Sequence, residues 1–206
     1  WRHDVEFSVR NACRLAQIEK EENVKSTFFL QLHSEYYNVL DKRNIDSIRK
    51  NIIESGHSLG LHFDIHYHEI GDSRHIDKYL LKDKEILEDI FKVSLQSFSF
   101  HNTNSFILNC ENDYYGGLVN VYSRRIKNIP YCSDSLGYWR YERLQDMLEN
   151  RSIKKLQVLT HDAMWSEKAL SPRQRIRRSI QQDADDLMVY YDNYLLRFGH
   201  KNIDEN

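Results

Sequence analysis

Short apolar runs alternate with helix-like stretches along the whole chain, and this alternation is what most restricts its fold. The run 26–30 is short, apolar and rich in residues of high β propensity, as is typical of a buried parallel strand. The stretches 9–22 and 76–91 instead repeat apolar residues at helical spacing. Alternating strands and helices predict an α/β fold with a parallel sheet, either open or closed into a barrel.

The same patterns bound the other elements. Strands are expected at 1–7, 26–30, 57–63, 97–101, 117–122, 130–133 and 155–160, and helices at 9–22, 45–54, 76–91, 142–148 and 171–198. Ser8 is an expected N-cap, Gly56 an expected C′ residue, and Ser171 followed by Pro172 begins the last helix. The sequence contains no repeat and no linker, so we expect one domain over residues 1–206.

Composition excludes some classes of function. The chain has 206 residues, 40% of them hydrophobic and 29% charged, with a formal net charge of −2. This balance is typical of a globular domain and provides no basic field that would attract nucleic acid or an anionic membrane. The basic run 173–178 is therefore interpreted as a solvated helix face. No run of about 18 apolar residues exists, so no transmembrane segment is expected.

The three cysteines, at positions 13, 110 and 132, are widely spaced and form no C-x-x-C pair. This spacing argues against a thiolate metal site, and a reducing, cytoplasmic setting is the expectation. The chain starts with Trp1 inside an expected strand, so we also expect residues upstream of it to be missing.

Histidines cluster in one short segment. Four of the ten histidines lie within residues 56–68, where a strand is expected to run into a polar turn. His62 would stand at the end of the strand and His66 four residues later, so that both imidazoles contact one ion. Asp4, at the end of another expected strand, would add a carboxylate, and such a set leaves one position open, as in catalytic zinc sites. A solvated turn whose histidines bind nothing is the alternative.

Other chemically capable residues also fall at strand ends. Asp4, His62, His101, Asp134 and His161 each lie at or just after the end of an expected strand. In folds of alternating strands and helices, functional side chains gather at the carboxyl ends of the strands. We therefore expect these five residues to share one rim of the sheet.

Five motifs follow one another along the chain. They are Arg2-His3-Asp4-Val5-Glu6, the set Gly56-His57, Gly60, His62 and His66, Ser99-Phe100-His101-Asn102, Asp134-Ser135-Leu136-Gly137-Tyr138-Trp139-Arg140, and Leu156-Gln157-Val158-Leu159-Thr160-His161. In this order they resemble the polysaccharide deacetylase (NodB-homology) superfamily of metal-dependent carbohydrate deacetylases. The resemblance spans nearly the whole chain and is closest to a divergent branch associated with bacterial capsule and O-antigen synthesis.

The resemblance implies a distorted, incomplete (β/α) barrel and one divalent metal ion, zinc by default, held by Asp4, His62 and His66. It implies removal of an acetyl group from an N-acetylated sugar, a precursor of a surface polysaccharide. His161 would be the general acid, because an imidazole titrates near neutral pH. Asp134 would orient that imidazole.

The general base is left open. The family carries two consecutive aspartates in its first motif, the first of them as base, whereas this chain has His3 before Asp4. Strand residues two apart share a face, which favours Glu6, while a strand that ends at His3 would favour His3 instead. Thr103 and Asp162 also stand where the branch has proline, and these departures bear on substrate positioning more than on metal binding.

Some of these residues have both a functional and a structural interpretation. Trp139 would either stack on a sugar ring or pack in the core, and His101 would either contact the substrate or close its strand. Asp134 is also common as a turn residue. Two functions therefore stay open: a metal-dependent hydrolase acting on an N-acetylated sugar, and a catalytically inactive carbohydrate-binding relative. The absence of any G-x-G-x-x-G or P-loop pattern argues against a nucleotide-binding protein.

Overall fold

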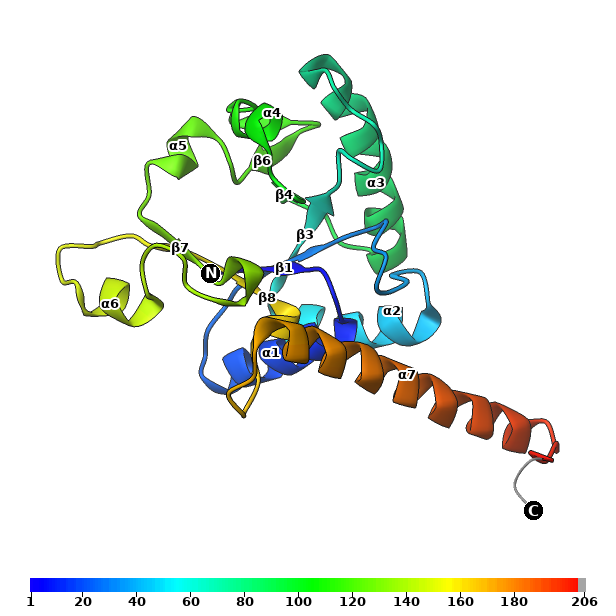
Figure 1. Ribbon diagram of the computed structural model, residues 1–206. Coiled ribbons are helices and arrows are strands. Elements are labelled where there is room, and N and C mark those ends of the chain that lie inside the picture. Colours follow the sequence, from blue (N-terminus) through cyan, green and yellow to red (C-terminus); the bar gives the residue numbers. More distant parts are fainter. Residues whose placement is uncertain (204–206) are drawn as a thin grey trace.

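The computed structural model describes residues 1–203, and its centre is one eight-stranded sheet (Figure 1). The strands are β1 (Arg2–Val5), β2 (Thr27–Leu30), β3 (Ser58–Phe63), β4 (Ser97–Phe100), β5 (Tyr114–Tyr115), β6 (Leu118–Asn120), β7 (Tyr131–Ser133) and β8 (Gln157–His161). Their order in the sheet is β5-β6-β4-β3-β2-β1-β8-β7, and every neighbouring pair is parallel except β5 and β6. The sheet curls into a half-barrel, which confirms the expected distorted, incomplete (β/α) barrel.

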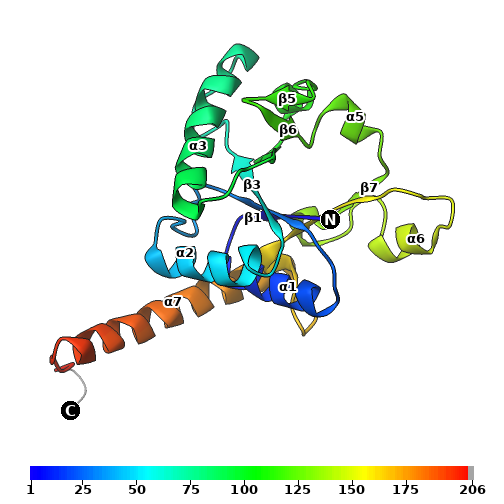
Figure 2. The same ribbon diagram turned by 180° about the vertical axis from the view of Figure 1, so that it is seen from behind.

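Helices and short turns connect the strands. They are α1 (Val9–Glu21), α2 (Lys42–Ile48), η1 (Arg49–Ile53), η2 (Ser73–His75), α3 (Ile76–Phe91), α4 (Ser105–Leu108), α5 (Arg124–Lys127), η3 (Ser135–Gly137), α6 (Leu144–Glu149), η4 (Asp162–Met164) and α7 (Pro172–Arg197). Figure 2 shows α1 and α2 side by side under the sheet, while α3 covers a different part of it. The helix expected at 45–54 begins earlier because the Asp41 carboxylate caps the amide of Arg43, and it ends as the π-helix η1.

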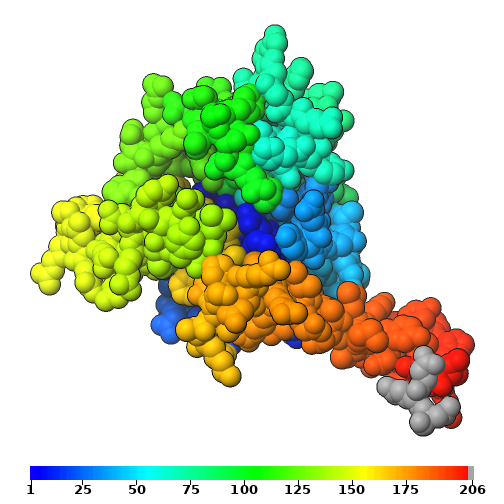
Figure 3. Space-filling model, in the orientation of Figure 1, coloured from blue at the N-terminus to red at the C-terminus, as the bar shows by residue number. Residues whose placement is uncertain are grey.

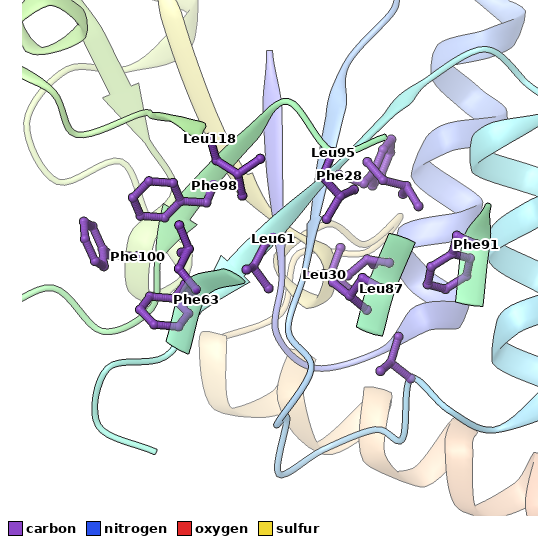
Figure 4. Close-up of a cluster of buried hydrophobic side chains, with 14 of the residues drawn as sticks. Phe28, Leu30, Leu61, Phe63, Leu87, Phe91, Leu95, Phe98, Phe100 and Leu118 are labelled. Carbon is purple, nitrogen blue, oxygen red and sulfur yellow. The ribbon is translucent and has the colours of Figure 1, made fainter. Parts of the chain in front are cut away.

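Aromatic and aliphatic side chains fill the space between the sheet and α3 (Figure 4). The labelled residues come from β2, β3, β4, β6 and α3 and from the loop before β4: Phe28, Leu30, Leu61, Phe63, Leu87, Phe91, Leu95, Phe98, Phe100 and Leu118. Each fully buried side chain of this size contributes about 1.5–3 kcal/mol to folding. The central strands β1, β2, β3, β4 and β8 are short and mostly buried on both faces.

Close packing of β2 against β3 requires a glycine. A Cβ atom added to Gly60 would lie 2.4 Å from Cδ1 of Phe29 and 3.1 Å from the carbonyl oxygen of Ser97. Gly56, with a φ of 82°, ends the π-helix before β3, in the left-handed conformation expected of a C′ residue.

The two expected N-caps differ. Ser171 forms a complete capping box with Gln174 and begins α7, as predicted. Ser8 is the N-cap of α1, as predicted: its backbone is extended and its carbonyl oxygen accepts from the amide of Ala12 at 3.1 Å, although its side chain makes no capping hydrogen bond. The Ser8 hydroxyl instead donates to Asp183 of α7, at 3.1 Å.

The last helix, α7, extends away from the rest of the molecule (Figure 1). Apolar residues of its C-terminal half are exposed, including Leu187, Tyr190 and Leu196. Within residues 1–203, no helix combines the length and the apolar character that a membrane crossing requires.

Candidate metal centre

The side chains of β1 alternate between the two faces of the sheet. Asp4 and Glu6 lie on the face that carries the strand-end histidines, whereas His3 lies on the face covered by α1. The ring nitrogens of His3 contact Glu19 Oε1 at 2.8 Å and Thr160 Oγ1 at 2.5 Å. Of the two candidate bases, Glu6 is therefore the one beside the other predicted site residues. The catalytic role of either residue stays a prediction.

Three possible ligand atoms form a small triangle at the ends of β1, β3 and β4. Glu6 Oε1 lies 3.4 Å from Nε2 of His62 and 3.3 Å from Nδ1 of His101, and the two nitrogens are 3.1 Å apart. Zinc bonds of about 2.0–2.1 Å in tetrahedral geometry place neighbouring ligand atoms roughly 3.3–3.4 Å apart. The triangle therefore has the dimensions of three ligands of one ion, with a fourth position open.

The carboxylate of this triangle is held in its charged form. Burial disfavours the Glu6 anion, but hydrogen bonds from His101 and His62 and the charge of His161 outweigh that cost and keep the pKa of Glu6 below its usual range. Burial likewise opposes protonation of His101, while its hydrogen bond to Glu6 and the Glu6 charge raise the pKa of His101. The Glu6 carboxylate therefore supplies the negative charge of the triangle.

Asp4 lies beside the triangle rather than in it. Its Oδ2 accepts a hydrogen bond from Ser99 Oγ at 2.9 Å and lies 3.8 Å from His62 Nδ1, and its Oδ1 lies 3.9 Å from the Arg2 guanidinium. Asp4 Oδ1 and His62 Nδ1 are buried without a hydrogen-bond partner among residues 1–203. The dimensions of the triangle and its carboxylate and imidazole donors fit a divalent cation, whereas the unpaired Nδ1 of His62 lies on the Asp4 side of the ring.

His66 is not brought to the triangle. Its side chain is exposed, and Nε2 lies 3.0 Å from the backbone oxygen of Asn102. Of the three predicted ligands, His62 belongs to the triangle, Asp4 borders it and His66 lies apart. The ligand roles of Asp4 and His66 stay predictions, and His101, which sequence reasoning assigned to substrate or strand, joins the group.

His161 faces the triangle from the side of β8. Its Nε2 lies 3.8 Å from Glu6 Oε1, while its Nδ1 lies 2.7 Å from Asp134 Oδ1. Trp165 Nε1 donates to the other oxygen of Asp134 at 3.0 Å. Burial opposes the charged imidazole, but the hydrogen bond to Asp134 and the charge of Glu6 prevail and raise the pKa of His161 to about 9. A buried, protonated imidazole with a fixed orientation is suited to donate a proton.

Asp162 was missed as a site residue, although its place directly after His161 is a signal in the sequence. Its buried carboxylate accepts hydrogen bonds from the backbone amides of Glu6, Phe7 and Ser8 at 2.8, 3.1 and 2.6 Å. Burial outweighs these bonds and raises the pKa of Asp162 to about 7. Asp162 thus holds the turn that carries Glu6 against the end of β8.

Trp139 lies further from the triangle. It is partly buried and lines a shallow surface pocket of about 440 Å³ together with Arg143, Leu144 and Trp165. Trp165 connects this pocket to Asp134 through its indole N–H. Figure 3 shows a hollow in the same face of the molecule, whose floor is the N-terminal segment in dark blue. Contact between Trp139 and a sugar stays a prediction.

Comparison with known proteins finds similarity in the fold. No protein-family model and no curated protein matches the chain. A chitin deacetylase from the fungal pathogen Colletotrichum lindemuthianum aligns with a TM-score of 0.50 at 17% identity, over 88% of this chain and 80% of that one. The polysaccharide deacetylase Bc1974 from Bacillus cereus aligns with a TM-score of 0.46 at 17% identity, over 89% of this chain and 86% of that one.

A mutant of BA3943, described as a CE4 family pseudoenzyme, aligns with a TM-score of 0.48 at 16% identity, over 90% of this chain. This chain spans 61% of the length of that protein. At these identities the likeness concerns the fold, which is the (β/α) half-barrel of polysaccharide deacetylases. The chemistry of this chain must be argued from its own residues.

Proposed function

We propose that this chain is a metal-dependent hydrolase that removes an acetyl group from an N-acetylated sugar during the synthesis of a surface polysaccharide. The observation that carries the proposal is the triangle of Glu6, His62 and His101 beside the His161–Asp134 pair. Amide hydrolysis needs a polarised carbonyl, an activated water and a protonated leaving amine. The five motifs and the half-barrel fold support a sugar amide as the substrate.

Glu6, His62 and His101 would hold the ion, and Asp4 would orient His62 from the Nδ1 side, as carboxylates commonly do for metal-bound histidines. A divalent cation bound there supplies a Lewis acid and lowers the pKa of a bound water to about 7. This set replaces Asp4 and His66 of the expected ligands by Glu6 and His101, and it keeps His62.

His161 holds the proton that the leaving amine requires. The hydrogen bond to Asp134 fixes the ring so that Nε2 faces Glu6 and the open side of the triangle. Glu6 is the carboxylate nearest to that position, and we assign to its second oxygen the proton lost by the attacking water. His3 is turned toward α1 and takes no part in this scheme.

Metal content of protein purified without a histidine tag tests the proposal. Zinc or a similar ion is expected at the triangle in the parent, and His62→Ala is expected to lose one equivalent of it. Glu6→Gln and His101→Ala should also lose the ion, whereas Asp4→Asn and His66→Ala should keep most of it. His75→Ala, which changes an exposed histidine, is the matched control. Loss in His66→Ala with retention in His101→Ala would restore the ligand set expected from the sequence.

A catalytically inactive carbohydrate-binding relative is the alternative, favoured by the histidine that stands at position 3 in place of the family's usual base. Acetate release from a panel of N-acetylated sugars separates the two functions. The hydrolase releases acetate, and His161→Ala abolishes the release while the ion stays bound. Sugar binding without any acetate release by the metal-loaded parent would favour the inactive relative. The cytoplasmic setting stays a prediction.

A further inference from the structure

A carboxylate stands in the apolar face of α3. This face is formed by Ile76, Leu80, Leu87 and Phe91 at helical spacing, and Asp83 occupies the remaining position in the series, with 3% of its surface exposed. A buried carboxylate destabilises a protein unless it is hydrogen bonded and its charge is balanced. Its position in the middle of this face therefore points to a specific partner.

Two imidazoles meet this carboxylate from the loops that follow β2 and β3. Nε2 of His33 lies 3.2 Å from Oδ1 of Asp83, and Nε2 of His68 lies 2.9 Å from Oδ2. Ligand atoms of the three residues all lie within 4.8 Å of one another. The side chains of His33, His68 and Asp83 are 21%, 10% and 4% exposed, so the group reaches solvent on the His33 side.

Aromatic rings hold both imidazoles in these orientations. His33 stacks on Tyr67 with ring centroids 3.7 Å apart and an interplanar angle of 7°. His68 stacks on Phe63 at 5.4 Å and on Tyr79 at 4.9 Å. The ligand atoms are therefore brought together by packing before any ion arrives, which lowers the entropy lost on binding.

We propose that His33, His68 and Asp83 bind a second divalent cation of the zinc class, with water completing its coordination. Two imidazoles and one carboxylate suit zinc, cobalt or nickel and not calcium or magnesium, which take oxygen ligands. Two neutral imidazoles would satisfy the carboxylate oxygens but would leave a buried negative charge, which a divalent cation balances.

The ion would join the loops after β2 and β3 to α3. The loop after β3 also carries His66, so the second site fixes a segment next to the candidate metal centre. The proposal rests on contacts separate from those of Glu6, His62 and His101, and it does not depend on the hydrolase function.

Cobalt titration of tag-free protein tests the second site. The parent should bind two equivalents, His62→Ala should bind one, and His62→Ala combined with His33→Ala should bind none. His62→Ala combined with His75→Ala, an exposed histidine of η2, is the matched control and should still bind one. Circular dichroism checks that each variant is folded. Retention of one equivalent when His62→Ala is combined with His33→Ala, or binding of none by His62→Ala alone, would overturn the proposal.

A thiolate at position 33 gives a direct readout at the site itself. His33→Cys in the His62→Ala background should show a thiolate-to-cobalt charge-transfer absorption, because the new sulfur would bind the ion. The native cysteines at 13, 110 and 132 are buried, and His75→Cys in the same background should show no such band. Absence of the band in folded His33→Cys would leave His33, His68 and Asp83 as a hydrogen-bonded ion pair only. A band in this variant, together with no acetate release by the metal-loaded parent, would support the second site while contradicting the hydrolase function.

Discussion

Two groups of histidine and glutamate lie on opposite faces of β1, and they differ in how completely the protein satisfies them. Under α1, His3, Glu19, Ser26 and His57 form a closed network in which all four ring nitrogens have partners: Glu19, Thr160, Ser26 and the carbonyl oxygen of Ala16. On the other face, the triangle of Glu6, His62 and His101 leaves His62 Nδ1 without a hydrogen bond among residues 1–203.

The comparison teaches that residue type alone does not separate a structural histidine from a candidate ligand. Both groups are at least partly buried, and both combine imidazoles with a carboxylate. In the closed network every ring nitrogen has a partner within residues 1–203, whereas the triangle has ligand atoms at coordination distances and lies 3.8 Å from His161 Nε2 through Glu6 Oε1. The two groups differ in whether every ring nitrogen has a hydrogen-bond partner, and that depends on the fold.

The largest effect is expected for His161, which lies beside the triangle and has no counterpart in the closed network. Replacing His161 by Ala should lower kcat by about 10²–10⁴-fold, because the leaving amine loses its proton donor. Metal content should stay unchanged, since His161 lies outside the triangle. Steady-state kinetics together with metal analysis of the same sample check both parts. An unchanged kcat would show that the proton donor is another group.

A second pair of variants tests whether the triangle binds an ion and the closed network does not. His62→Ala should remove the ion from the candidate centre, whereas His57→Ala should keep it and instead destabilise the fold by about 1–3 kcal/mol, because Ser26 and the Ala16 carbonyl lose a buried partner. Urea unfolding and metal analysis measure the two outcomes. Loss of metal in folded His57→Ala would mean that the closed network also contributes to the site.

A third variant changes the residue that links β8 to the turn before α1. Asp162→Asn places an amide where three backbone N–H groups converge, so that at least one of them loses its acceptor. We expect the free energy of unfolding to fall by about 1–3 kcal/mol and kcat to fall with it, because Glu6 is no longer held in place. Asp183→Asn, which changes a carboxylate bound only to the Ser8 hydroxyl in this region, is a control for the loss of charge.

The smallest effect concerns pH and the closed network. Burial opposes ionisation of Glu19, but hydrogen bonds from His3 and Ser26 outweigh it and lower the pKa of Glu19. A carboxyl whose pKa is lowered by folding adds stability above its unfolded pKa of about 4.3, and this contribution is lost as the pH falls through the lower, folded pKa. Unfolding curves should be measured between about pH 3 and pH 7. The free energy of unfolding should fall less steeply with falling pH in Glu19→Gln than in the parent. Equal slopes would argue against the network's role.

The sequence predicted the fold well because alternation and strand-end position are local signals. The half-barrel, the capping box at Ser171 and the clustering of Glu6, His62 and His161 near one rim follow from such patterns. The ligand grouping could not be predicted in the same way. His66 would share a face with His62 only in a helix, but the chain leaves β3 in turns that the Asp64 carboxylate stabilises by accepting from the amides of residues 66 and 67.

The place of His101 in the triangle depends on the register of β4 against β3, where His62 is paired with Ser99. The spacing of residues along the sequence does not predict how β4 is paired with β3. Asp162 was missed for a related reason, because its partners lie more than 150 residues earlier in the chain and meet it only through the pairing of β8 with β1.

The curl of the sheet sets the geometry of the candidate site. Strands β3, β2 and β1 separate β4 from β8, so His101 and His161 converge on Glu6 through sheet curvature and not through any local motif. Gly60 lets Phe29 pack closely between β2 and β3, at the middle of that arc. A larger side chain at position 60 would force the arc to flatten or shift. His161 and the triangle of Glu6, His62 and His101 would then move apart although none of these side chains had been replaced, so the geometry of the candidate site is partly a property of backbone shape.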